Sequence, residues 1–112
     1  MKKNTYVVMF STAGNEKEAY KIANHLVKNH LVACVNIVPS LRSVYWWNNK
    51  VNHDNEVLMI LKTKTKKVPK IEKAIRALHS YDTPELIAFQ LQYGLPRYLQ
   101  WMDGALSAGI KK

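Results

Sequence analysis

Five consecutive apolar residues in the middle of the chain constrain the fold more than any other feature. The run is Val57-Leu58-Met59-Ile60-Leu61. Successive side chains of a strand point to opposite faces, so a strand built from this run needs cover on both faces. A similar run, Tyr6-Val7-Val8-Met9-Phe10, lies near the N-terminus. The sequence therefore predicts a sheet with two apolar faces.

Hydrophobic periodicity and turn residues predict the elements around these two runs. A helix is expected after Asn15, a second over about residues 66–79, and a short third after Gly94-Leu95-Pro96, with Gly109 as its stop. A polar, asparagine-rich stretch over 48–55 suits a hairpin connection, and a short ladder of its own is an open alternative there. Strands are expected over residues 6–12, 32–38, 44–47, 56–63 and 85–93.

Local signals refine three of these elements. Asn15 can cap the first helix, with Glu18 completing a capping box, and Thr65 can cap the second, with Pro69 harmless in its first turn. Pro39 separates two strand segments that can form one long strand. Because proline cannot donate to a central ladder, we expect a bend or bulge there.

The element order is strand, helix, strand, strand, helix, strand. This order predicts an α+β fold of the ferredoxin-like βαββαβ type, with an antiparallel sheet, an extra C-terminal helix and a single domain over residues 1–112. Two main helices can cover one sheet face, which leaves the other face without a partner inside the chain. The sequence therefore predicts a homo-oligomer, and the alternative is that the long hairpin or the C-terminal helix folds over that face.

The chain is strongly basic, with 17 lysines and arginines against 8 acidic residues and a net charge of +9. The excess raises the question of a nucleic-acid partner, but a solvated face is the favoured interpretation because the arginines are scattered. The densest basic stretch contains Lys62, Lys64, Lys66, Lys67, Lys70 and Lys73.

Several functional classes find no support in the residues. No apolar stretch approaches the length of a membrane span, and the N-terminal run is too short for a signal peptide, so a cytoplasmic location is expected. The single cysteine, Cys34, leaves no internal disulfide. The glycines form no phosphate-binding motif and no nucleophile motif is readable, so we expect a protein that is not an enzyme.

Five segments together resemble the CutA family. They span nearly the whole chain in the family's order, which makes the match more specific than any single short motif. The resemblance implies a ferredoxin-like subunit in a tight homotrimer, a role in divalent-cation tolerance, copper binding, and a shape similar to that of PII signalling proteins. The segments are residues 33–39, 43–47, 56–63, 81–85 and 98–101.

The copper-binding pattern carried over from the family is incomplete in this chain. A cysteine of that pattern falls at Ser11, and two adjacent histidines fall at Leu78 and His79. A hydroxyl and an aliphatic side chain cannot replace a thiolate and an imidazole. Only His79 remains as a metal ligand of this type, so a copper or other divalent-metal site built that way is expected to be weak or absent.

The connection after the second predicted helix holds the best group of candidate residues. His79, Tyr81, Asp82 and Glu85 gather an imidazole, a phenol and two carboxylates, and Lys62 can bring a cation near them. A structural role is the alternative, with His79 capping the helix and Asp82 bonding the turn. Cys34 can be a small core residue or a thiolate ligand. Residues Cys34, Lys62, Tyr81, Asp82 and Glu85 are the candidates for a cleft between subunits.

Two further groups leave alternatives open. His53, Asp54 and Glu56 could form a three-ligand cluster, although solvated turn residues are the simpler interpretation. The three tryptophans, Trp46, Trp47 and Trp101, are expected in an interface or the core rather than in a stacking platform. The rival to a metal-tolerance function is a PII-like module that binds a small ligand or a protein partner at subunit clefts.

Overall fold

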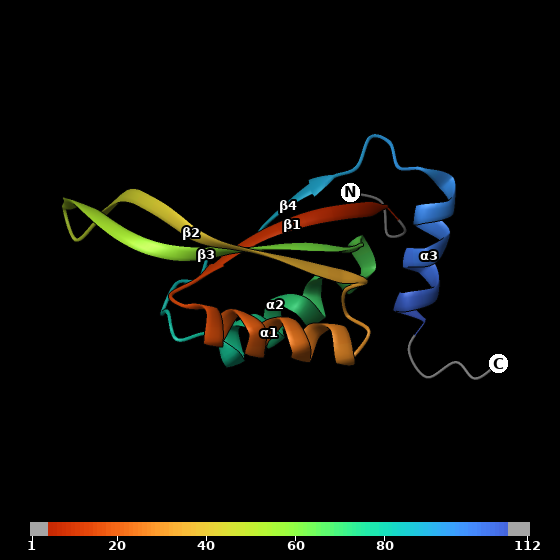
Figure 1. The fold of residues 1–112 in the computed structure, drawn as a ribbon, viewed down its shortest axis with the longest axis horizontal. Coiled ribbons are helices and arrows are strands. Elements are labelled where there is room, and N and C mark those ends of the chain that lie inside the picture. The colour runs from red at the N-terminus through yellow and green to blue at the C-terminus, as the bar shows by residue number, and fades with distance from the viewer. Residues whose placement is uncertain (1–4, 108–112) are drawn as a thin grey trace.

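The computed structural model describes residues 5–107 and contains one antiparallel four-stranded sheet in the order β2-β3-β1-β4. The strands and helices follow in the predicted order, so the ferredoxin-like α+β fold is confirmed (Figure 1). The strands are β1 (Tyr6–Ala13), β2 (Cys34–Trp47), β3 (Lys50–Lys64) and β4 (Ile87–Gln90), and the helices are α1 (Glu16–Lys28), α2 (Val68–Leu78) and α3 (Pro96–Leu106).

Helices α1 and α2 lie together against one face of the sheet, while α3 stands at one end of it (Figure 1). The core between the helices and the sheet is built from alternate strand residues such as Met9, Met59 and Leu61, which meet Ile22 of α1 and Ile75 of α2. Burial of these side chains is the main stabilising term for this layer. Among the described residues, no helix has the length and apolar character needed to cross a bilayer.

The two predicted strand segments around Pro39 form the single strand β2. The pairing with β3 shifts between Val38 and Leu41, and Ser40 takes a positive φ of 65° at the shift. Strand β2 lies at the edge of the sheet, so the missing N–H of Pro39 removes no bond from a central ladder. The predicted bulge is confirmed.

The hairpin between β2 and β3 is tighter than predicted. Only Asn48 and Asn49 form the turn, both with positive φ, and residues 50–55 belong to β3 rather than to a loop. Asparagine tolerates this left-handed backbone, which matches the twist of the flanking strands. The alternative of a short ladder within this polar stretch is therefore confirmed.

The predicted helix starts are partly wrong. The side chain of Asn15 accepts from the backbone N–H of Glu18, as predicted, but the Glu18 carboxylate turns to Ser80 instead of returning to Asn15. Thr65 begins a short 3₁₀ turn, Thr65–Lys67, and Lys67 occupies the cap position of α2. The Thr65 hydroxyl donates instead to the carbonyl of Thr5, so a tertiary contact replaces the expected local bond of Glu18 and of Thr65, while the Asn15 cap is kept.

The last strand is shorter than the predicted 85–93. Strand β4 pairs only with Val7–Phe10 of β1, because the segment before it is held by another contact, described below. The expected helix stop at Gly109 lies outside the described residues, and α3 ends at Leu106 with Ser107 as its cap.

The sheet face opposite α1 and α2 is apolar and open. Phe89 is 50% exposed and Ile87 47% exposed, and Phe10 packs edge-on against Phe89 with ring centroids 5.1 Å apart. The strand pairing places Val8, Leu58 and Ile60 on the same face. Neither the hairpin nor α3 covers the middle of this face, so the alternative of self-coverage is wrong for the described chain. We call this surface the open face.

Helix α3 is anchored to the end of the sheet by both packing and hydrogen bonds. Met102 and Leu106 pack on Ala33, and the Asp103 carboxylate accepts from the Tyr6 hydroxyl at 2.9 Å and from the Lys64 ammonium at 3.0 Å. The anchor fixes α3 beside β1 and β3 and leaves its outer side exposed.

Replacing Asp103 with asparagine is expected to make the free energy of unfolding fall less steeply as the pH is lowered. Partial burial acts to raise the pKa of Asp103, but the hydrogen bonds from Lys64 and Tyr6 outweigh it and hold the pKa below its ordinary value of 3.8. The carboxylate therefore stabilises the fold above about pH 4, and this contribution is lost as the pH falls through the lowered pKa. Because the side chain is 46% exposed, the effect should stay below about 1 kcal/mol.

Urea unfolding of wild type and Asp103→Asn at pH 6 and pH 3 measures this effect. The loss of stability between the two pH values should be smaller in the variant. Equal losses in the two proteins would show that the Asp103 anchor carries no net charge effect.

Candidate functional site

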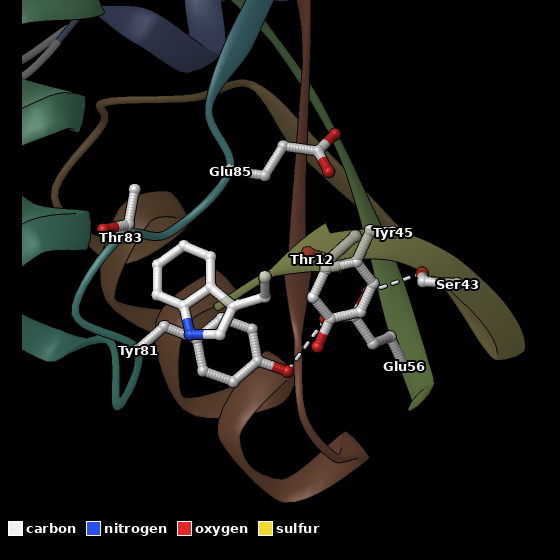
Figure 2. Close-up of a pocket in the computed structure, with 8 residues that line it drawn as sticks. Thr12, Ser43, Tyr45, Glu56, Tyr81, Thr83 and Glu85 are labelled. Atoms are coloured by element: carbon white, nitrogen blue, oxygen red, sulfur yellow. Dashed lines mark hydrogen bonds between the residues drawn. The ribbon is translucent and has the colours of Figure 1, made fainter. Parts of the chain in front are cut away.

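A groove of about 440 Å³ opens between the β2–β3 hairpin and the loop that joins α2 to β4. Its lining combines two glutamates, three aromatic residues, and three serine or threonine residues (Figure 2). No lysine, arginine or histidine is among the lining residues. The lining residues are Thr12, Ser43, Tyr45, Trp47, Glu56, Tyr81, Thr83 and Glu85.

Strand geometry explains why these residues share one groove. Ser43, Tyr45 and Trp47 alternate along β2 and therefore point to one face. On the other side, β4 stops pairing with β1 at Phe10, so the loop before β4 lies beside the last residues of β1. The buried Ser11 hydroxyl donates to the backbone carbonyl of Glu85 at 2.7 Å and holds the loop there.

Glu56 is the most tightly held carboxylate of the groove. The Tyr81 hydroxyl donates to its Oε2 at 2.8 Å, and the Ser43 hydroxyl donates to its Oε1 at 2.6 Å, as the dashed lines in Figure 2 show. Burial, and then the hydrogen bond to Glu56, raise the pKa of Tyr81 far above its ordinary value of 10.0. The phenol therefore stays a neutral donor at physiological pH, and it fixes the orientation of the carboxylate.

His79 lies behind the groove, buried, and its ring is fully used by the backbone. Its Nε2 is 2.6 Å from the carbonyl oxygen of Thr12, and its Nδ1 accepts from the backbone N–H of Tyr81 at 3.0 Å. The carbonyl needs a donor, so Nε2 carries the hydrogen and Nδ1 carries the lone pair. A metal could reach this ring only at Nδ1, by displacing the Tyr81 N–H.

The predicted cleft residues fall into two groups within one chain. Cys34 and Lys62 are paired across β2 and β3, and the Lys62 ammonium lies 5.8 Å from the ring centroid of Tyr98. Tyr81 and Glu85 line the groove near Glu56. Glu56 and Lys62 are six residues apart along β3, a distance of roughly 20 Å. The expectation that Lys62 brings a cation near Tyr81 is therefore wrong within a single chain.

Asp82 points away from this group. It lines a second groove, of about 460 Å³, beside the Glu72–Arg76 ion pair of α2. The first and second grooves share only Thr83. Asp82 is therefore separated from Tyr81 and Glu85, its neighbours in sequence.

The proposed cluster of His53, Asp54 and Glu56 is not formed. Strand alternation sends His53 to the face opposite Asp54 and Glu56, and Asp54 accepts a hydrogen bond from Tyr45. Over residues 5–107, no three His, Cys, Asp or Glu side chains come together in an arrangement that could hold a metal ion. The turn prediction for His53 and Asp54 is also wrong, because both residues belong to β3, whereas Glu56 lies in a strand as predicted.

The tryptophans do not enter the core of the single chain. Trp46 is 72% exposed, and Trp47 and Trp101 are each 50% exposed. Their expected role in an interface stays a prediction.

The lysines of the densest basic stretch do not act as one group. Lys64 pairs with Asp103, and Lys62 lies over the ring of Tyr98.

Sequence reasoning missed the hairpin half of the groove. The sequence predicts Trp47 as an interface or core residue, and Ser43 and Tyr45 only as part of a family segment, although the i, i+2, i+4 spacing of the three is typical of one strand face. The missing information was the register with β3, which places this face beside Glu56.

Comparison with known proteins gives the family. The model of the CutA1 divalent ion tolerance protein family matches residues 7–105. The chain belongs to this family. A CutA1 structure from Oryza sativa superposes with a TM-score of 0.88 at 36% identity, covering 92% of this chain and 94% of that one. A CutA structure from Xylella fastidiosa gives a TM-score of 0.89 at 34% identity, covering 92% and 99%.

Curated CutA relatives agree with this membership. The divalent-cation tolerance protein CutA of Thermus thermophilus is 42% identical over 95 residues, which cover 85% of this chain and 92% of that protein. Protein CutA of Mus musculus is 42% identical over 93 residues, covering 83% of this chain but 52% of that protein. The chain thus spans about half the length of several curated CutA relatives that it matches.

Proposed function

We propose that this CutA1-family chain works as a homotrimer in which each copy shields the open face of another. The observation that supports the proposal is the apolar open face itself, with Phe10, Ile60, Ile87 and Phe89 only partly covered. At roughly 25 cal/mol per Å² of apolar surface, covering several such side chains is worth several kcal/mol per chain. Exposed patches of this kind mark association surfaces.

Sedimentation at micromolar concentration tests the assembly. The expected mass is three times that of the 12.9 kDa chain. A stable species with the mass of one chain would contradict the proposal.

The proposed role of the trimer is in divalent-cation tolerance, with the cation bound where subunits meet. Cys34 and Lys62 lie towards one end of the sheet, and Tyr81 and Glu85 towards the other. Packing of copies over the open face can bring opposite ends of two chains together. This arrangement would restore the predicted cleft from Cys34 and Lys62 of one copy and Tyr81 and Glu85 of another, without Asp82, which lines the second groove.

Copper binding is the specific form of this proposal, and His79 is its candidate ligand. Because Nδ1 of His79 already accepts from Tyr81, copper must compete with a backbone hydrogen bond. We expect a weak copper titration, with heats that fall in His79→Gln, a variant that keeps a polar side chain. Calorimetry on the assembled proteins measures this, and the matched control is His25→Gln on the exposed side of α1. Equal heats in wild type and His79→Gln would remove His79 from the site.

A second candidate function is that of a PII-like module that binds a small ligand. The groove between the hairpin and the α2–β4 loop favours it, because a volume of about 440 Å³ suits a small molecule. Its rigid carboxylate and its aromatic walls are the mixed polar and apolar lining typical of such sites.

A further inference from the structure

Six lysines on the outer side of the layer formed by α1 and α2 have no acidic partner. Each of them is exposed, and none makes an ion pair with a described residue. We call these six residues the lysine surface. They are Lys17, Lys21 and Lys28 of α1, Lys66 in the turn before α2, and Lys70 and Lys73 of α2.

Helical spacing puts the six ammonium groups on one side of the layer. The lysines follow one another at i, i+4 and i+11 in α1 and at i, i+4 and i+7 around α2, and such spacings return to the same side of a helix. The buried residues Ile22 of α1 and Ile71 of α2 take the side that packs against the sheet. Because α1 and α2 lie against the same face of the sheet, the lysines project away from it (Figure 1).

Antiparallel alignment of the two helices gathers these lysines into one area. The Glu18 carboxylate near the start of α1 accepts from Ser80 after α2, and the Thr63 hydroxyl before α2 donates to the carbonyl of Leu31 after α1. The end of α1 therefore lies beside the start of α2. Helix α1 has 13 residues and is roughly 20 Å long, so six charges without counter-charges share a small surface and create a positive potential over it.

The acidic residues of the two helices are directed elsewhere. Glu18 is held by the loop after α2. Glu16 lines a groove with Arg42 of β2, and Glu72 pairs with Arg76 in the groove on the β4 side of α2. The lysine surface is therefore not neutralised by the helices that carry it.

The lysine surface stays accessible when copies of the chain associate over the open face. The two helices cover the opposite face of the sheet, and the lysines lie on the outer side of those helices (Figure 1). An assembly that covers the open face therefore presents one lysine surface per chain to its surroundings.

We propose that the lysine surface binds the headgroups of an anionic phospholipid membrane. It contains no arginine, whose planar fork suits bidentate contacts to phosphates and bases, and no aromatic ring on which a base could stack. Lysine is a compact, hydrated charge, and a charged plane attracts it without a fixed geometry. Clusters of about four to eight basic residues on amphipathic helices are typical of attachment to anionic lipid. The surface therefore fits a membrane better than a nucleic acid.

Co-sedimentation of the assembled protein with vesicles tests the proposal. The probe is phosphatidylcholine vesicles with about 30% phosphatidylserine in about 0.15 M salt, and pure phosphatidylcholine vesicles are the neutral comparison. We expect binding to the anionic vesicles alone, and its loss in about 1 M salt, where charges are screened beyond about 3 Å. Lys21→Gln combined with Lys70→Gln should weaken this binding by about tenfold or more, because each lysine near an anionic surface contributes several-fold.

The matched control combines Lys50→Gln at the hairpin end with Arg97→Gln in α3. It removes the same two charges away from the helix layer and should weaken binding by less than about twofold. Sedimentation and circular dichroism of both double variants separate lost binding from lost assembly or folding.

Three outcomes would overturn the proposal. Equal weakening by the two double variants would show that the lysine surface is not the binding site. Equal binding to anionic and neutral vesicles would show that charge does not direct the attachment. Binding of single-stranded DNA that needs Lys21 and Lys70, without binding of the anionic vesicles, would make the surface a nucleic-acid site.

Discussion

Replacing Ile60 with glutamate is expected to produce a folded chain that no longer assembles. Ile60 is half-buried in the middle of the open face, where it pairs with Phe10 of β1 and Asn36 of β2. In a single chain the new carboxylate keeps access to water. In a trimer that covers this face it would be buried without a partner, which costs several kcal/mol per copy. We expect the dissociation constant to rise by a factor of roughly a thousand or more.

Sedimentation and circular dichroism of Ile60→Glu measure assembly and folding separately. Ile60→Val keeps an apolar side chain at the same place and should still assemble. Lys73→Gln, on the exposed side of α2, lowers the net charge by the same single unit and controls for the change in net charge. An Ile60→Glu protein that assembles like wild type would show that the open face is not the association surface.

Replacing His79 with alanine is expected to lower the free energy of unfolding by about 3 kcal/mol, whether or not a metal is present. The ring joins two segments, since Nε2 donates to the carbonyl oxygen of Thr12 in β1 and Nδ1 accepts from the backbone N–H of Tyr81 in the loop after α2. Alanine leaves a buried carbonyl and a backbone N–H without these partners and opens a void. Denaturant unfolding of wild type and variant measures the difference.

Two further variants define the source of this effect. His79→Gln retains a donor and an acceptor and should recover part of the lost stability. Tyr81→Phe removes the hydroxyl bond to Glu56 but keeps the backbone N–H, so it should cost less than His79→Ala. If His79→Ala unfolds like wild type in metal-free buffer, the histidine is not structural, and the metal interpretation gains strength.

The contacts of His79 also show where residue patterns stop being informative about a site. Its sequence position after α2 allowed either a helix-end role or a metal ligand. The structure gives the ring two backbone partners, from β1 and from the following loop. The Tyr81 N–H is a local partner, two residues along the chain, but Thr12 is 67 residues away, so no local pattern could have indicated the bond to β1.

The groove illustrates the same limit. Glu85 and Tyr81 were singled out from the sequence, whereas Ser43, Tyr45 and Trp47 were not connected to them. The link runs through Glu56, which accepts from both Ser43 and Tyr81. It depends on the β2–β3 register and on the early end of β4. Both follow from pairing between distant segments.

The amino-acid sequence by itself determined the order of the elements, the bulge near Pro39 and the presence of an uncovered apolar face. These features follow from the alternation of side chains along strands and helices, which is a local property of the backbone. Only the tertiary structure decided that Glu18 bonds Ser80, that the cleft candidates lie in separate groups, and that Glu56 joins the two sides of a groove. Those outcomes depend on which long-range partner satisfies each polar group, and spacing along the chain carries no information about that choice.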